Sequence, residues 1–175
     1  MRNNKLYKLV LTALFIALNC ASTIIIQIPS PMNGYINLGD CFVLVSGWLL
    51  GPFYGFLAGG IGPAIADIMT GYSHYAIATF FIKGIVALIA ALLFKALQKT
   101  HQKHVRLSRI ISGIVAESVM VVSYFGYAAL ILGNGMAALT SVPGNLIQAV
   151  VGIVVAVILI EVVVKLNLIK NKNEN

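Results

Sequence analysis

Ionisable side chains interrupt several apolar stretches of this sequence. Asp40 stands near the start of the stretch GYINLGDCFVLVSGWLLGP, and Asp67 and Lys83 lie in similarly apolar surroundings further along. A charge in an apolar environment is costly, so such residues usually pair with one another or face a polar cavity. These residues therefore indicate either internal ion pairs or a binding cavity, and the elements that carry them must be placed first.

The composition is that of an integral membrane protein. Of the 175 residues, 59% are hydrophobic and 10% are charged, and the mean hydropathy is +0.94. Soluble domains carry about 25% charged residues. A soluble chain of this length could not bury so much apolar surface, so the composition excludes a soluble domain.

The basic residues follow a pattern typical of cytoplasmic segments. The net charge is +7, and every Lys and Arg except Lys83 falls into one of three clusters that flank apolar runs. Such an excess of positive charge marks the cytoplasmic side of a membrane. The clusters are Arg2, Lys5 and Lys8, then Lys95, Lys99, Lys103, Arg106 and Arg109, then Lys165, Lys170 and Lys172.

Six spans are predicted from the apolar runs and these charges. Four runs are long enough to cross a bilayer, whereas the region 38–69 is interrupted by Gly51 and Pro52 and forms either one kinked helix or two short ones. If this region forms two helices, the chain has six spans and both basic termini lie on the same side of the membrane, whereas one helix would give five spans and opposite sides. We therefore predict an all-α single membrane domain over 1–175, with both termini cytoplasmic and spans at 9–28, 38–51, 53–69, 75–97, 110–132 and 142–164.

The glycines at 51, 55 and 59 recur every four residues, which favours close helix packing over ligand contact.

This topology brings polar side chains from several spans to one level, just below the outer surface. Ionisable residues at such a depth suggest a functional cavity. We expect the cavity to be formed by Asn37, Asp40, Asp67, His74, Tyr75, Lys83, Tyr124, Tyr127, Asn145 and Gln148.

Some of these residues also have structural interpretations. Asn37 and Asp40 have the spacing of an N-cap pair, and Asp67 and Lys83 could neutralise each other. The two tyrosines of the fifth span, at 124 and 127, could belong to an interfacial aromatic belt.

Two glutamates fall outside the expected cavity. Glu117 lies deeper in the fifth span, where it is either the cavity floor or an interhelical partner. Glu161 is expected to pair with Lys165, four residues on.

Motifs for several chemistries are missing from the sequence. There is no P-loop, no H-E-x-x-H and no G-x-S-x-G motif. The two cysteines lack metal-site spacing, and the predicted topology distributes the three histidines over both sides of the membrane. We therefore expect neither an enzyme nor a cofactor or metal.

The first span carries a stripe of small residues. Ala13, Ala17 and Ala21 recur every four residues, so they share one face of a helix. Such a face either packs inside the helical bundle or accepts an external helix.

Taken together, these features resemble the substrate-binding S component of the energy-coupling factor (ECF) vitamin transporters. The resemblance covers nearly the whole chain and is strongest over GYINLGD…GPFYGFLAGGIGPAIADIMTGYSHYAIATFFIKG, between Gly34 and Gly84. It is closest to the branch assigned to hydroxymethylpyrimidine or pyridoxine-type vitamins, with riboflavin as the alternative cargo.

The resemblance implies a division of labour. The S component of a prokaryotic cell membrane captures a vitamin in an outward cavity. A transmembrane T component and two cytoplasmic ATPases supply the energy. In this family the alanine stripe contacts the T component, and the cavity is formed by the outer halves of the last three helices under the first and third outer loops. A self-sufficient secondary transporter is the competing class, but six spans without an inverted repeat argue against it.

Overall fold

The computed structural model describes residues 4–30, 34–100 and 104–165. Four residues of the basic clusters lie outside the described ranges: Arg2, Lys103, Lys170 and Lys172. The described chain forms helices α1 (Asn4–Ile25), α2 (Asp40–Leu50), α3 (Pro52–Met69), α4 (Ser73–Thr100), α5 (Val105–Gly126) and α6 (Val142–Lys165). A π-helical turn, η1 (Tyr127–Ile131), and a 3-10 helix, η2 (Gly135–Ser141), connect α5 to α6.

The region 38–69 is two helices, as the charge pattern predicted. Gly51 separates α2 from α3 with a φ of 82°, a conformation that glycine adopts at no steric cost. Pro52 then occupies the first turn of α3. Backbone N–H groups in the first turn have no acceptor within the helix, so the missing N–H of proline costs no hydrogen bond there. The turn reverses the chain, so α2 and α3 pack against each other.

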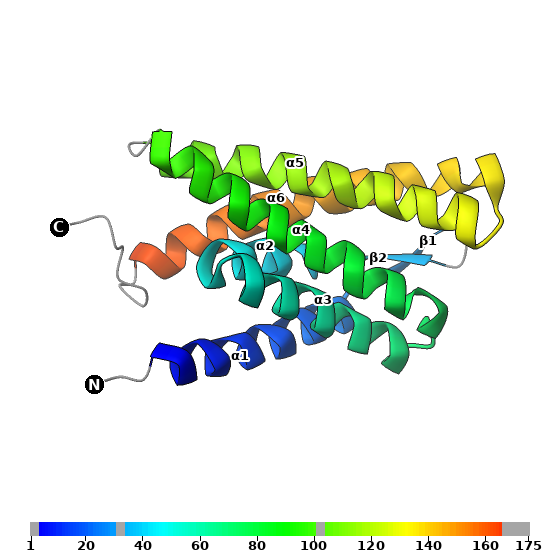
Figure 1. The fold of residues 1–175 in the computed structure, drawn as a ribbon. Helices are drawn as coiled ribbons and strands as arrows, with labels where there is room; N and C mark the ends of the chain where they lie inside the picture. Colours follow the sequence, from blue (N-terminus) through cyan, green and yellow to red (C-terminus); the bar gives the residue numbers. More distant parts are fainter. Residues whose placement is uncertain (1–3, 31–33, 101–103, 166–175) are drawn as a thin grey trace.

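Four stretches are long and apolar enough to cross a membrane: Lys5–Ile25, Ser73–Lys99, Val105–Ile131 and Gly135–Lys165. Helix α2 is apolar but shorter. The helices run back and forth between two ends of the molecule, so that the start of α1 and the end of α6 lie at the same end (Figure 1). We call this end, with the α2–α3 turn and the α4–α5 connection, the basic end, and the opposite end the cavity end.

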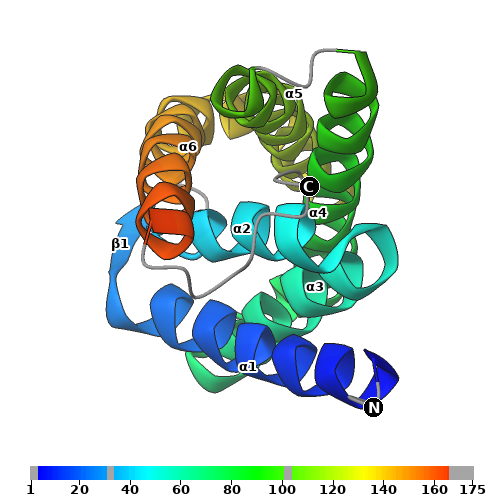
Figure 2. The same cartoon turned by 90° about the vertical axis from the view of Figure 1, so that its left-hand side faces the viewer.

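The buried core centres on α2. Seen along the bundle, α4, α5 and α6 lie on one side of α2, whereas α3 and α1 lie on the other (Figure 2). Val43, Leu44 and Val45 of α2 are almost completely buried. Helix α1 packs mainly on α3 and α2, which leaves much of its surface uncovered.

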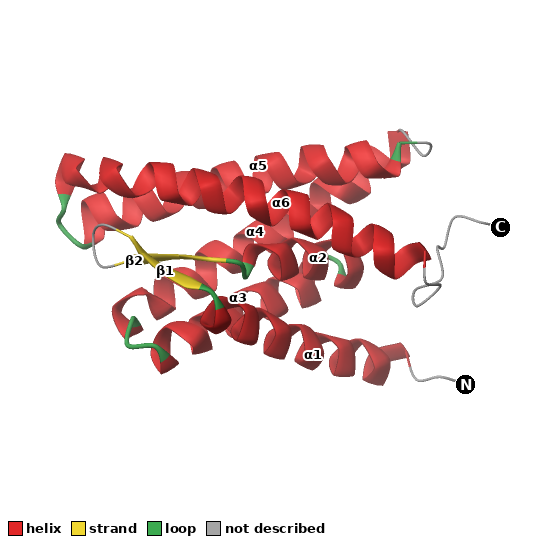
Figure 3. Cartoon of the chain, turned by 180° about the vertical axis from the view of Figure 1, so that it is seen from behind, coloured by secondary structure: helices red, strands yellow, loops and turns green. Residues whose placement is uncertain are grey.

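The expectation of a purely helical chain is wrong for the segment between α1 and α2. Strands β1 (Gln27–Ser30) and β2 (Gly34–Asn37) pair antiparallel, with Gln27 opposite Asn37 and Ser30 opposite Gly34. The hairpin lies at the cavity end (Figure 3). The predicted span 9–28 therefore ends early, because α1 stops at Ile25 and the chain turns into β1.

Small residues make the close helix contacts, as predicted for Gly55 and Gly59, whereas the prediction is wrong for Gly51, where a Cβ would meet nothing within 4 Å. A Cβ at Gly59 would stand 2.9 Å from the Ala87 side chain of α4, and one at Gly62 would stand 2.6 Å from Asn19 of α1. Real Cβ contacts are not this short, so each helix pair depends on its glycine. The glycines of α3 thus serve packing.

Candidate binding cavity

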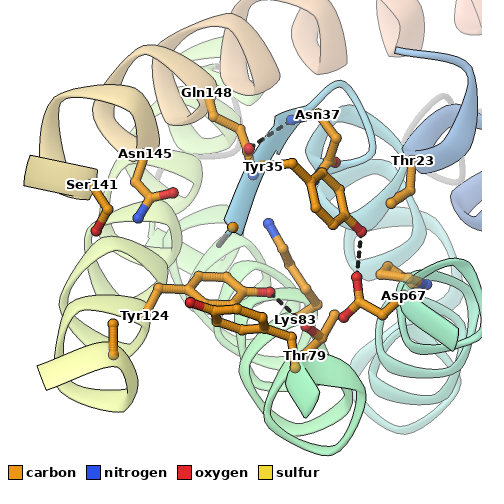
Figure 4. Close-up of a pocket in the computed structure, with 14 residues that line it drawn as sticks. Thr23, Tyr35, Asn37, Asp67, Thr79, Lys83, Tyr124, Ser141, Asn145 and Gln148 are labelled. Atoms are coloured by element: carbon orange, nitrogen blue, oxygen red, sulfur yellow. Dashed lines mark hydrogen bonds between the residues drawn. The ribbon is translucent and has the colours of Figure 1, made fainter. Parts of the chain in front are cut away.

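A polar cavity opens at the cavity end, between the hairpin and the helices. Its volume is about 50 Å³, enough for a few water molecules. Every helix except α2 contributes to the wall, and β2 closes one side (Figure 4). The lining residues are Thr23, Gly34, Tyr35, Asn37, Pro63, Asp67, Tyr75, Thr79, Lys83, Tyr124, Ala128, Ser141, Asn145 and Gln148.

Seven of the ten predicted site residues line this cavity. They are Asn37, Asp67, Tyr75, Lys83, Tyr124, Asn145 and Gln148. The other three lie nearby but outside the lining. Asp40 is completely buried in the first turn of α2, whereas His74 is exposed at the start of α4 and receives a hydrogen bond on its carbonyl from the Tyr127 hydroxyl.

Lys83 forms its ion pair with Asp40, so the predicted pairing of Lys83 with Asp67 is wrong. The side chains of Lys83 and Asp40 are 3% and 1% exposed. Sequence distance could not distinguish the two aspartates. The choice is made by α2, which runs through the middle of the bundle and brings Asp40 to the inward face of α4.

The Asp40 carboxylate has a second partner on α6. Its other oxygen accepts a hydrogen bond from the Gln148 amide at 2.5 Å. Gly152 permits this approach, because a Cβ there would stand 2.8 Å from the Asp40 Cβ. One carboxylate thereby connects α2, α4 and α6.

Asn37 does not cap α2, contrary to the capping interpretation. Helix α2 begins at Asp40, the preceding Gly39 has no side-chain cap, and the Asn37 side-chain oxygen accepts from the Gly39 N–H at 2.8 Å. The Asn37 N–H donates to the Gln148 side-chain oxygen, also at 2.8 Å. Asn37 therefore joins the end of the hairpin to α6 and shapes the cavity wall.

Three hydrogen bonds between described residues hold the hairpin over the cavity. Besides the bond from Asn37 to Gln148, the Gln27 amide donates to the Thr70 hydroxyl at 3.3 Å, and the Tyr35 hydroxyl donates to Asp67. Burial, together with the Asp67 carboxylate, raises the pKa of Tyr35. The phenol therefore stays protonated and remains a donor at neutral pH.

Aromatic rings form the other face of the cavity. The Tyr75 ring centre lies 5.3 Å from that of Tyr127 and 6.4 Å from that of Tyr124. The Lys83 ammonium lies 5.4 Å from the centre of the Tyr124 ring, and the Tyr124 hydroxyl donates to Thr79 at 3.1 Å. Tyr124 belongs to the cavity wall rather than to an interfacial belt.

Seven lining residues were not among the ten predicted site residues, and four of them come from elements before α4. Two of these four, Gly34 and Tyr35, belong to the first outer loop, which the family resemblance placed over the cavity. Thr23 comes from α1, and Gly34 and Tyr35 come from β2. Tyr35 lies within the quoted GYIN stretch, so its neighbours Asn37 and Asp40 could have pointed to it. Thr23 had no such signal, because a threonine in an apolar helix is ordinary.

The two glutamates also differ from expectation. Glu161 pairs with Arg106 of α5 at 3.1 Å, so the predicted pairing with Lys165 is wrong. Glu117 is 1% exposed, and its two oxygens form no hydrogen bond among the described residues. It does not line the cavity, and neither predicted role of Glu117 is shown.

The alanine stripe of α1 faces outward. Ala13, Ala17 and Ala21 are all exposed, whereas Phe15 and Asn19, on the opposite face, are buried against the bundle. The Asn19 amide donates to the Ala58 carbonyl of α3 at 3.1 Å, which fixes the rotation of α1. The stripe is therefore not used for packing inside the bundle.

Comparison with known proteins agrees with this architecture. The family model described as "ECF-type riboflavin transporter, S component" matches residues 3–165. A protein of Pyrococcus woesei, described as an uncharacterized protein in gap 3′ region, is 34% identical over 135 residues, which cover 77% of this chain and 86% of the relative.

The chain therefore belongs to the family of ECF-type riboflavin transporter S components. It is a multi-pass protein of the prokaryotic plasma membrane. Members of this family are substrate-binding subunits of ECF transporters rather than enzymes, and they generally work with a T component and ATPases.

Proposed function

We propose that this chain captures a small water-soluble vitamin with a single heteroaromatic ring, hydroxymethylpyrimidine or a pyridoxine-like compound. The observation that carries the proposal is the cavity itself, which combines a tyrosine wall with a few amide, hydroxyl and charged groups in about 50 Å³. Small-molecule sites have this character, with apolar and aromatic walls and few polar groups. The aromatic wall suits the faces of a heteroaromatic ring, and the polar groups suit its substituents.

Riboflavin is the second candidate, because the matching family model carries that vitamin in its description. A cavity of about 50 Å³ must open for any ring-shaped ligand, and a three-ring flavin with its sugar chain needs much more additional room than a single ring. The hairpin would have to move away, and it is held to both α3 and α6. The size of the cavity therefore favours the smaller ligand.

A binding experiment separates these candidates. The purified protein is titrated by calorimetry with hydroxymethylpyrimidine, pyridoxine and riboflavin, and the compound that co-purifies with it is identified by mass spectrometry. We expect tight binding of one of the single-ring compounds. If riboflavin binds tightly and neither hydroxymethylpyrimidine nor pyridoxine binds, the proposal is wrong and riboflavin is the ligand.

We also propose that the protein crosses the membrane six times with the basic end in the cytoplasm. The described cations Lys5, Lys8, Lys99, Arg106 and Lys165 all belong to segments at that end, as the positive-inside rule requires. Helices α2 and α3 would span as a short pair. Accessibility of single cysteines in the α4–α5 connection and in the hairpin to an impermeant thiol reagent tests this orientation.

The exposed alanine stripe is proposed to bind the T component, which acts with two ATPases. Three alanines on one helical face allow another helix to approach closely, and Ala13, Ala17 and Ala21 are free of contacts that would bury them. Ala17→Trp should therefore leave vitamin affinity near normal but abolish ATP-dependent uptake. Normal assembly and uptake by this variant would reject the partner face.

Reconstitution tests the transporter class. The chain alone in vesicles should bind the vitamin without accumulating it, whereas addition of the T component and the ATPases should permit ATP-dependent uptake. Uptake by the chain alone would favour a self-sufficient transporter.

A further inference from the structure

One carboxylate oxygen in the cavity wall has no hydrogen-bond partner. Asp67, near the end of α3, is 1% exposed, and Oδ1 accepts from the Tyr35 hydroxyl. Oδ2 forms no hydrogen bond by geometry among the described residues, although the Thr79 hydroxyl, which accepts from Tyr124, lies close enough to stabilise the charged form of this carboxylate. Asp67 lines the cavity (Figure 4). A buried acceptor without a donor is unfavourable, so this oxygen is a natural attachment point for a ligand.

Two other polar side chains of the cavity, Lys83 and Gln148, are already engaged, whereas the neutral Thr23 hydroxyl, like Asp67 Oδ2, has no hydrogen-bond partner among the described residues. Lys83 is paired with Asp40, which neutralises its charge. Gln148 uses its oxygen for the Asn37 N–H and its amide for Asp40. Among the described residues that line the cavity, Asp67 is thus the charged side chain without an ion-pair partner.

This difference determines which ligands the wall favours. A carboxylate accepts hydrogen bonds but donates none, and its bonds to amino groups or protonated ring nitrogens are charge-assisted and strong. A ligand that carries a carboxylate or phosphate would instead bring a second negative charge close to Asp67, at a cost that grows in the low-dielectric interior.

We infer that Asp67 Oδ2 is the specificity-determining acceptor of the site, which selects ligands that present an amino group or a protonated ring nitrogen and disfavours anionic ones. The inference rests on the proposed single-ring ligand and refines its chemistry. The outer-half positions of Lys83, Asn145 and Gln148 predict that these three residues bind the ligand, but Lys83 and Gln148 are already engaged in the structure.

The same carboxylate fastens the hairpin. Oδ1 holds Tyr35 of β2, so ligand binding at Oδ2 and closure of the hairpin involve one side chain. A ligand that fixes the orientation of Asp67 also fixes the acceptor for Tyr35. Tyr35→Phe removes this connection without altering Oδ2, so it should accelerate ligand dissociation while preserving the preference for amino-bearing ligands.

Two probes on the unmodified protein provide the first test. Calorimetry compares hydroxymethylpyrimidine, which carries a ring amino group, with the same ring bearing hydrogen in its place. We expect roughly 10- to 100-fold weaker binding of the second probe, the range of a hydrogen bond to a charged group. Equal affinities would overturn the inference, and this comparison stands even if no variant folds.

Asp67→Asn provides the second test. The amide keeps the shape and can still accept from Tyr35, but it removes the charge and can place an N–H towards the ligand. We expect it to lose most of the discrimination between the two probes. Glu161→Gln removes a carboxylate at the basic end and is the matched control, with unchanged affinities expected.

The outcomes separate the inference from the proposed function. If the unmodified protein binds neither probe nor pyridoxine, the single-ring proposal fails, and the inference that rests on it fails as well. If the amino probe binds tightly and Asp67→Asn retains the full preference for it, the inference alone is overturned.

Discussion

Two ion pairs of very different character occur among the residues that the structure describes. Lys83 and Asp40 meet between helices α4 and α2, with side chains 3% and 1% exposed, whereas Arg106 and Glu161 meet at the basic end with side chains 70% and 32% exposed. The buried pair is surrounded by further hydrogen bonds, and the exposed pair is a single contact. Loss of one partner therefore has different effects on stability in the two pairs. At the surface, water solvates the charge that remains, whereas in the core that charge stays buried and unpaired.

The comparison also shows where the fold is specified. Asp40 receives Lys83 from α4 and Gln148 from α6, so it requires three helices to lie in one arrangement. Arg106 and Glu161 join only α5 to α6. The buried pair lies directly under the cavity, which makes the cavity wall dependent on it.

The largest effect is expected from Lys83→Met, which leaves the Asp40 charge buried without its partner. Breaking a buried ion pair in this way costs about 3–5 kcal/mol of stability. We expect a large loss in unfolding free energy, measured by chemical denaturation in mixed micelles, together with loss of vitamin binding. Stability within about 1 kcal/mol of the unmodified protein would contradict the role given to this pair.

The double variant Asp40→Asn/Lys83→Met is the control for that experiment. It removes both charges and leaves an amide oxygen that Gln148 can still reach. Because replacing both partners avoids an unpaired buried charge, much of the lost stability should return. A double variant as unstable as Lys83→Met would mean that the methionine, rather than the orphaned charge, causes the loss.

A smaller effect is expected from Gly152→Val, which alters the geometry of the buried pair without changing any charge. The added Cβ would stand 2.8 Å from that of Asp40, so α6 must shift away from α2. Overpacking of this kind costs about 1–3 kcal/mol. Thermal unfolding measures the loss, and Gly126→Val, where a Cβ meets nothing within 4 Å, is the matched control.

The smallest effect is expected from Glu161→Gln, which breaks the exposed pair. Surface ion pairs contribute about 0–1 kcal/mol, and salt screens them. Any loss of stability should shrink further when the salt concentration is raised, as measured by denaturation at low and high ionic strength. A loss as large as that of Lys83→Met would remove the distinction between the two pairs.

Much of the architecture followed from local properties of the chain. The apolar runs indicated the long helices, and the Gly51-Pro52 break separated α2 from α3, because these residues act on the backbone in their own vicinity. The hairpin of β1 and β2 was not predicted, since four-residue strands carry little periodic signal. Its pairing is stabilised by contacts to α3 and α6 that lie far away in sequence.

The sequence by itself determined that the chain is a membrane protein with buried charges, and it identified half of the residues that line the cavity. Composition and the position of each polar residue along its helix were enough for this prediction. The position of a residue along a spanning helix gives its depth in the membrane, and this depends only on the nearby sequence. Only the tertiary structure decided which charge meets which. Lys83 lies 16 residues from Asp67 and 43 from Asp40, yet it pairs with Asp40, because side-chain pairing depends on how helices rotate and pack, and this is set by small residues on the facing helix. The pairing in turn left Asp67 as the open acceptor of the cavity.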